Sequence, residues 1–222
     1  MKSNQELQTD VQNAIKWEPL LHAAEIGVTA KDGIVSLSGV VDSYPKKLEA
    51  ESAAKKVIGV KALVEKIEVQ MPNSWSKTNE EIASAVLVAL KTNWLVPNEK
   101  INVEVEDGWV TLEGELPWNY QKDAAKNAVN NIAGIKGVMN NIKIKADSHD
   151  EIEKKAVEDA IGRSLSIDDC DIEVEVEGTT VTLTGTVDSF YQKDEAGRIA
   201  WNTPGIWHIK NELAVDYEFA LD

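Results

Sequence analysis

The sequence has few of the features that mark exported or membrane proteins. Cys170 is the only cysteine among 222 residues, so the chain cannot form an internal disulfide, and a lone cysteine suits a reducing compartment. No apolar run reaches the roughly 18 residues of a membrane-spanning helix, and the start, MKSNQELQTDV, lacks the core of a signal peptide. We therefore expect a cytoplasmic protein from the sequence as written, or a periplasmic one if an N-terminal signal has been removed.

Residues that carry catalysis or ligate metals are equally sparse. The chain has no G-x-S-x-G motif and no phosphate-cradling glycine loop, and one cysteine with three scattered histidines matches no zinc-ligand spacing. Asp168, Asp169 and Asp171 lack the alternation and the glycine of an EF-hand loop, so solvated loop acids are favoured over a cation site. Cys170 fits a small apolar residue better than a nucleophile, since no base is identifiable beside it. We expect no enzyme, no cofactor and no metal.

Negative charge is concentrated in the last part of the chain. Of the net charge of −15, residues 1–72 hold −1, residues 73–145 hold −1 and residues 146–222 hold −13. A field of that sign repels phosphate backbones, so we expect no nucleic-acid partner. The simplest interpretation is that the charge serves solubility, and the alternative is that the third part performs a different task from the first two.

A stretch of strand–turn–strand pattern occurs three times. Ile101 to Gly114 (INVEVEDGWVTLEG) aligns without a gap with Ile26 to Gly39 (IGVTAKDGIVSLSG) and with Ile172 to Gly185 (IEVEVEGTTVTLTG). A second glycine follows each copy at a fixed spacing of 20 residues, which gives three glycine pairs: Gly39 and Gly59, Gly114 and Gly134, Gly185 and Gly205. A repeat of this kind predicts tandem copies of one small fold.

Each copy has the signals of the same five elements. A Ser/Thr-x-x-Glu capping box precedes a helical apolar stripe at three matching places: Ser3 and Glu6, Thr78 and Glu81, Ser148 and Glu151. Two alternating strands, an alanine-rich helix and a third strand follow. The sequence therefore predicts an α+β protein of three αββαβ modules, each with two helices on one face of a three-stranded sheet. We place module 1 at residues 1–72, module 2 at 73–145 and module 3 at 146–222.

The repeat glycines have structural explanations. Gly39, Gly114 and Gly185 close the second strand, where a glycine indicates a bulge or a backbone packed too closely against a helix to admit a Cβ. Their partners twenty residues later are expected to be helix C-terminal caps. Asp-Gly at positions 32–33 and 107–108 predicts tight hairpin turns, whereas the third copy has its glycine one place earlier, so its turn type is expected to differ.

These elements resemble the BON domain, named for bacterial osmotically induced and nodulation proteins. The resemblance rests on the V-x-L-x-G strand end, the alanine-rich helix and the glycine with a hydrophobic residue before the third strand. In the second copy the matching residues are Val110, Leu112, Gly114, Ala125, Val129, Gly134 and Ile135. The resemblance implies phospholipid binding or protein interaction, in proteins of osmotic stress, secretin assemblies and mechanosensitive channels.

Aromatic residues next to lysines recur between the second strand and the second helix of each copy. The candidate binding residues are Tyr44, Lys46 and Lys47 in the first, Trp118, Tyr120 and Lys122 in the second, and Phe190, Tyr191 and Lys193 in the third. Such a pairing is typical of an interfacial anchor, in which a ring enters the headgroup zone and a lysine meets phosphate. The alternative is that these rings pack over the end of the sheet as part of the core.

Two functions remain open from the sequence. The first is a non-catalytic module protein that associates with phospholipid surfaces in osmotic or envelope stress, with modules 1 and 2 making the contact because module 3 opposes anionic lipid. The second is a soluble multivalent interaction scaffold or holdase-like stress protein, since three linked modules add weak sites together. Cation sensing by the acidic module is a third and weaker hypothesis. The oligomeric state is left open.

Overall fold

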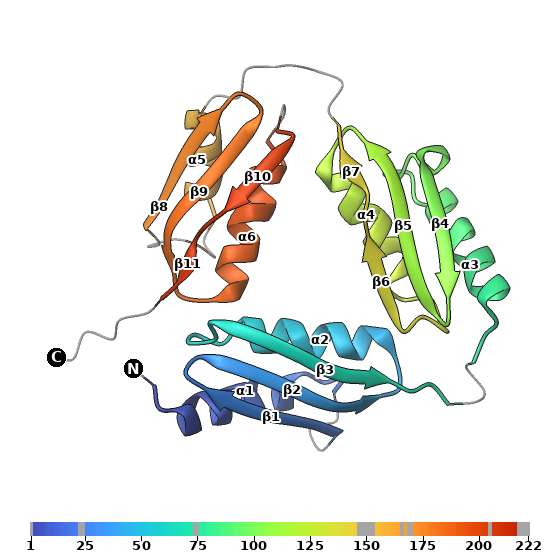
Figure 1. Ribbon diagram of the computed structural model, residues 1–222, viewed down its shortest axis with the longest axis horizontal. Coiled ribbons are helices and arrows are strands. Elements are labelled where there is room, and N and C mark those ends of the chain that lie inside the picture. The colour runs from blue at the N-terminus through green and yellow to red at the C-terminus, as the bar shows by residue number, and fades with distance from the viewer. Residues whose placement is uncertain are drawn as a thin grey trace. The chain divides into compact units, whose positions relative to one another are not determined.

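The computed structural model describes residues 2–21, 25–72, 76–145, 154–164, 167, 171–203 and 206–216. Within these residues the predicted α+β class and the three αββαβ modules are confirmed (Figure 1). Each module is described by itself. Two predicted features, the capping box of Ser148 with Glu151 and the expected cap at Gly205, lie outside the described residues. The expectation of a glycine C-cap is wrong at Gly59 and Gly134, which lie in the turns beyond the second helices of modules 1 and 2 with positive φ, and the C-cap of the module 2 helix is Asn130.

The element bounds follow the repeat. Module 1 contains α1 (Asn4–Trp17), β1 (Ile26–Lys31), β2 (Ile34–Val41), α2 (Tyr44–Lys55) and β3 (Ala62–Val69). Module 2 contains α3 (Asn79–Thr92), the 3-10 turn η3 (Asn98–Lys100), β4 (Ile101–Glu106), β5 (Trp109–Leu116), α4 (Asn119–Val129), β6 (Gly137–Asn140) and β7 (Lys143–Ile144). Module 3 contains α5 (Lys154–Gly162), β8 (Asp171–Glu177), β9 (Thr180–Val187), α6 (Phe190–Trp201), β10 (His208–Asn211) and β11 (Ala214–Val215).

The helix starts carry the predicted caps. At α1 and α3, the Ser3 and Thr78 side chains accept from the backbone N–H three residues on, and the glutamates at that position accept in return from the cap N–H. A third complete box, which the sequence analysis missed, starts α6 with Ser189 and Gln192. The sequence contains the pattern for this box, because Gln can take the place of Glu in a capping box.

The second strand of each module is the centre of its sheet. The first strand pairs with it antiparallel through the hairpin, and in modules 2 and 3 the third strand returns parallel to it after the helix, the crossover that a parallel pair requires. The third strand is not continuous in modules 2 and 3. It breaks after Asn140 and after Asn211, whose side-chain oxygens accept from the N–H two residues on.

The alternation of buried and exposed residues along the central strands shows which face of each sheet packs against the core. Val110, Leu112 and Leu116 of β5 are fully buried, and β2 and β9 repeat this pattern. The helices pack over this face, and α4 contributes the buried small residues Ala124 and Ala125, which let the helix lie close to the sheet. The opposite face of the sheet carries the polar positions of the alternation.

The hairpin turns differ between modules as the glycine position predicts. Asp107 and Gly108 both have positive φ, 48° and 82°, which is the type I′ pattern, and module 1 repeats it. In module 3, Glu177 pairs with Thr180, so the turn again has two residues, but only the first, Gly178, has positive φ. This is the II′ pattern, in which glycine is needed at the first turn position.

The repeat glycine was expected to close the second strand, but each second strand continues two residues beyond it, and Gly114 shows why a glycine is needed there. It pairs with Ile101, has φ of 148°, and an added Cβ would lie 2.1 Å from the carbonyl oxygen of Lys100. The equivalent glycines of modules 1 and 3 meet the carbonyl of Glu25 and of Asp171 at 1.9 Å. The close backbone that was expected is therefore the start of the first strand, not a helix.

We expect Gly114→Ala to destabilise module 2 by roughly 2–3 kcal/mol or more, because the substitution adds both a steric clash and an unfavourable φ. Hydrogen exchange of β4 and β5 in the full chain measures the effect. Gly162→Ala is the control, since no atom lies within 4 Å of its added Cβ and alanine is favoured in a helix. Unchanged exchange in Gly114→Ala would contradict the steric explanation.

Candidate functional site

Four chain segments meet at one end of module 2. Strand β5 ends there at Leu116, and the antiparallel strand β4 begins beside it, just after Lys100. Strand β7 ends there too, because it runs parallel to β5, and the backbone N–H of Lys145 donates to the carbonyl of Leu116 at 2.9 Å. Helix α4 starts two residues beyond β5. We call this end, with Lys100, Pro117, Trp118, Tyr120 and Lys145, the Trp118 edge.

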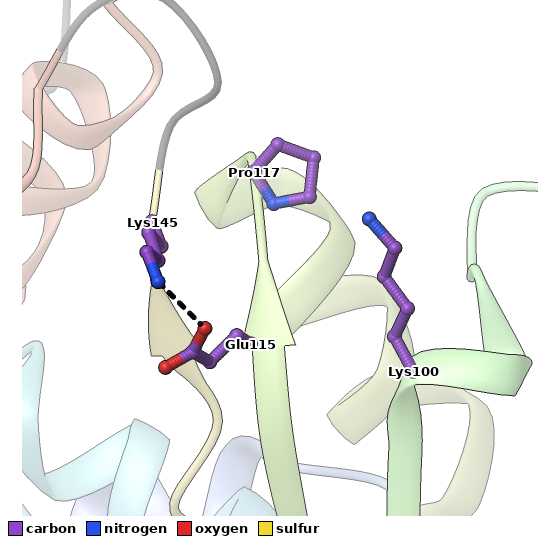
Figure 2. Close-up of a pocket in the computed structure, with 4 residues that line it drawn as sticks. All are labelled: Lys100, Glu115, Pro117 and Lys145. Carbon is purple, nitrogen blue, oxygen red and sulfur yellow. Dashed lines mark hydrogen bonds and ion pairs between the residues drawn. The ribbon is translucent and has the colours of Figure 1, made fainter.

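A small open pocket lies in the Trp118 edge (Figure 2). It has a volume of about 360 Å³ and is lined by Lys100, Glu115, Pro117 and Lys145. Lys145 reaches back to Glu115, with an Nζ to Oε2 distance of 3.3 Å, and both side chains are largely exposed, so this ion pair contributes little. Lys100 is exposed and has no ion-pair partner among the residues that the structure describes. The pocket therefore presents positive charge to solvent.

Trp118 and Tyr120 form the aromatic part of the edge. Trp118 is the N-cap residue of α4 and is half-buried, while Tyr120 lies in the first turn and is exposed. Their rings stack with centroids 6.4 Å apart and an interplanar angle of 28°. The stacked pair presents an apolar surface at the start of α4.

Lys122 lies one turn into α4 and is half-buried. Its backbone carbonyl accepts from Nδ2 of Asn140 at 2.9 Å, which ties the helix start to the break in the third strand. Module 3 repeats this bond between Asn211 and the carbonyl of Lys193 at 2.7 Å. Burial lowers the pKa of the Lys122 ammonium, an effect that nearby Asp123 opposes.

The equivalent end of module 1 is different. Tyr44 is only 6% exposed and is the first residue of α2, so the expectation of an exposed aromatic anchor in a loop is wrong at this position and the ring belongs to the core. Lys46 pairs with Asp42 at 2.8 Å. Lys47 is half-buried. At the places of Lys100 and Lys145, module 1 has Glu25 and Gln70.

The equivalent end of module 3 is acidic. The positions of Lys100, Pro117 and Lys145 are held by Asp171, Asp188 and Asp216. Phe190 and Tyr191 lie in the first turn of α6, half-buried and exposed respectively, and Nζ of Lys193 donates to the carbonyl of Leu213 at 2.7 Å. Among the described residues at these three equivalent ends, only that of module 2 has exposed lysines at the places of Lys100 and Lys145.

A second apolar surface, on the outside of α3, was missed by the sequence analysis. Leu87 and Val88 are 55% and 61% exposed, and Trp94, which follows the helix, is 90% exposed. The buried stripe of α3 is Ile82, Val86 and Leu90, so these residues lie outside it. We call Leu87, Val88 and Trp94 the outer face of α3. Trp94 precedes Lys100 in the chain and lies at the same end of module 2.

Comparison of the three modules shows that the exposed apolar pair Leu87 and Val88 occurs in module 2 and not at the matching described positions of the other two. At the places of Leu87 and Val88, module 1 has the exposed polar pair Gln12 and Asn13, and module 3 has the exposed acids Glu158 and Asp159. The signal available in the sequence was this exchange of residue type at matching positions. Apolar residues beyond the core stripe of a helix indicate a second contact surface.

None of the helices that the structure describes is both long and apolar enough to cross a membrane. Within the described residues, no group of three or more His, Cys, Asp or Glu side chains is placed to hold a metal ion. Asp168, Asp169 and Cys170 lie outside them, while Asp171 begins β8.

Comparison with known proteins gives a family. The family model described as the BON domain matches the chain three times, over residues 3–71, 78–146 and 149–217. Osmotically-inducible protein Y of Escherichia coli (strain K12) is 30% identical over 129 residues, which are 56% of this chain. The chain spans 64% of the length of that relative.

Solved structures show only distant likeness. The C-terminal domain of CdsD, the structural protein of the type III secretion system of Chlamydia trachomatis, is 16% identical with a TM-score of 0.26, covering 97% of this chain and 100% of that one. The PrgH periplasmic domain is 9% identical with a TM-score of 0.21, covering 88% and 96%. Scores this low carry no argument about this chain.

The bond between Asn140 and Lys122 gives a test of how the Trp118 edge is held. We expect Asn140→Ala to cost about 1–3 kcal/mol, because the Ile142 N–H loses its partner and α4 loses its tie to the sheet. Faster hydrogen exchange over residues 119–129 and 137–145 measures this. Exposed Asn141→Ala is the control and should change exchange little. Equal protection in both variants would contradict the anchoring role.

Proposed function

The chain belongs to the BON domain family, and on this basis we propose that it is a non-catalytic protein that docks on anionic phospholipid surfaces through module 2 during osmotic or envelope stress. The single observation that carries the proposal is the outer face of α3, where module 2 exposes Leu87, Val88 and Trp94, and where the other modules have polar or acidic residues at the places of Leu87 and Val88. The name of the relative, an osmotically-inducible protein, supports the link to osmotic stress.

The chemistry of this surface suits a membrane interface. An apolar helix face lies in the boundary between headgroups and acyl chains, Trp and Tyr rings sit at headgroup depth, and Lys100 and Lys145 at the Trp118 edge meet phosphate. Burying Leu or Val contributes about 1.5–3 kcal/mol per side chain, and each lysine near an anionic surface adds about 1 kcal/mol. These few contacts support weak and reversible docking.

A second candidate is a protein-interaction scaffold, and one observation favours it. On the sheet surface away from the helices, Trp109 lies against Gly137 close to exposed Met139, and module 1 has exposed Ile34 and Val64 at the places of Trp109 and Met139. Exposed apolar pairs repeated on two modules would suit a partner protein that contacts both. Lipid docking through α3 does not use them.

Replacing the outer face of α3 by the residues of module 1 tests the lipid proposal. We expect Leu87→Gln with Val88→Asn, and separately Trp94→Ala, to lower co-sedimentation with vesicles of zwitterionic and anionic lipid at physiological salt by at least about tenfold, since each removes apolar burial. Trp118→Ala should lower it as well.

Trp17→Ala is the matched control, because Trp17 is 85% exposed at the end of α1 but lies on a module without the apolar helix face. Its binding should stay within about twofold of wild type. Wild-type binding by the α3 variants would overturn the assigned site. If wild type binds no vesicle yet suppresses aggregation of a client protein, the scaffold is the better function.

A further inference from the structure

Module 3 carries the reverse charge of the surface that module 2 uses for docking. The places of Lys100 and Lys145 hold Asp171 and Asp216, and the place of Val88 holds Asp159. Strand β8 adds exposed Glu173, Glu175 and Glu177, and the module as a whole has a net charge of −13. A module of this charge is repelled by the anionic surface that module 2 would contact.

The covalent link between modules 2 and 3 keeps the negative charge of module 3 close to the docking surface of module 2. The second and third family matches end at residue 146 and begin at residue 149, so two residues separate them. The three steps from residue 146 to residue 149 span at most about 11 Å. A domain of this length has a radius of gyration of about 11 Å, so its charge stays within a few tens of ångströms of module 2 in any orientation.

Ionic strength decides whether the membrane field reaches that charge. The Debye length is about 30 Å at 0.01 M salt and about 8 Å at 0.15 M. At a separation of about 20 Å, the field of a charged surface therefore falls to about half in the first case and below about a tenth in the second. Apolar burial and contact between lysine and phosphate act at short range and are screened much less.

We propose that module 3 is an electrostatic brake on the docking of module 2, which rising ionic strength releases. The inference rests on the proposed lipid docking and assigns its regulation. Loss of water under high external osmolarity concentrates salt around a protein, so the brake makes docking respond to the stress itself. For docking by lysines alone, the salt dependence of the affinity would have the opposite sign, because salt weakens the attraction between lysine and phosphate at every concentration.

The test compares wild type with a neutralised variant of the full chain. The variant carries Glu173→Gln, Glu175→Gln, Glu177→Gln, Asp159→Asn and Asp188→Asn. None of these five carboxylates has an ion-pair partner among the described residues, so the changes remove like-charge neighbours without breaking contacts. Circular dichroism and thermal unfolding verify the fold. A module 3 surface variant with the single change Glu175→Gln guards against misfolding of the fivefold variant.

Binding to vesicles containing anionic lipid is measured from 0.01 to 0.3 M salt. Wild type should bind at least about fivefold more tightly at 0.15 M than at 0.01 M, while the variant binds about tenfold more tightly than wild type at 0.01 M and within about twofold at 0.15 M. Glu175→Gln should lie between them at low salt. Sucrose at equal osmolarity should leave wild type at its low-salt affinity, because it does not screen charge.

The outcomes separate the brake from the docking it regulates. If wild-type binding falls with salt in parallel with the variant, the brake is overturned and docking stands. If the vesicle affinity of wild type and of the neutralised variant rises equally with salt, or if sucrose produces the same rise, the response comes from apolar contact. That result also overturns the brake. Absence of binding by either protein at any salt overturns the proposed function itself.

Discussion

One contact between backbone atoms shapes each module. A carbonyl oxygen at the start of the first strand, that of Lys100 in module 2, lies where a Cβ would stand on the repeat glycine of the second strand, Gly114. The two strands can approach this closely only because that glycine has no side chain. The two-residue turn sets the register of the hairpin, and the contact lies at the end of the sheet where the α3–β4 connection, the β5–α4 connection and the third strand meet. The Trp118 edge lies at that end.

The same scaffold carries three different surfaces. Positions held by backbone geometry, such as Gly39, Gly114 and Gly185, do not vary among the modules, because their roles depend on a missing side chain. Positions that face solvent vary freely. Module 2 uses them for lysines, aromatic rings and the outer face of α3, and module 3 uses them for acids. A tandem array of one fold can therefore combine a contact surface and a charged module without changing its core.

The docking proposed for module 2 depends on weak contacts. Each module is small, and an exposed apolar strip of two or three side chains yields modest affinity. The charge of a neighbouring module then has a large relative effect, because it acts on a small binding free energy. Short covalent links keep that neighbour within electrostatic range. The distribution of charge along the chain, more than any single residue, determines how such a protein would respond to salt.

The sequence alone determined the architecture. Capping boxes, Asp-Gly turns and alternating strands are local signals, and their threefold recurrence predicted the αββαβ modules, because periodicity specifies backbone conformation and the buried side of each element. Only the tertiary structure decided which candidates are exposed. Tyr44 and Trp118 occur in similar sequence positions, yet Tyr44 is buried and Trp118 stacks on Tyr120 beside solvent. Lys100 and Lys145 are far apart in the chain and line one pocket only because β4 and β7 flank β5. Exposure depends on what covers a residue, and that depends on segments distant in sequence.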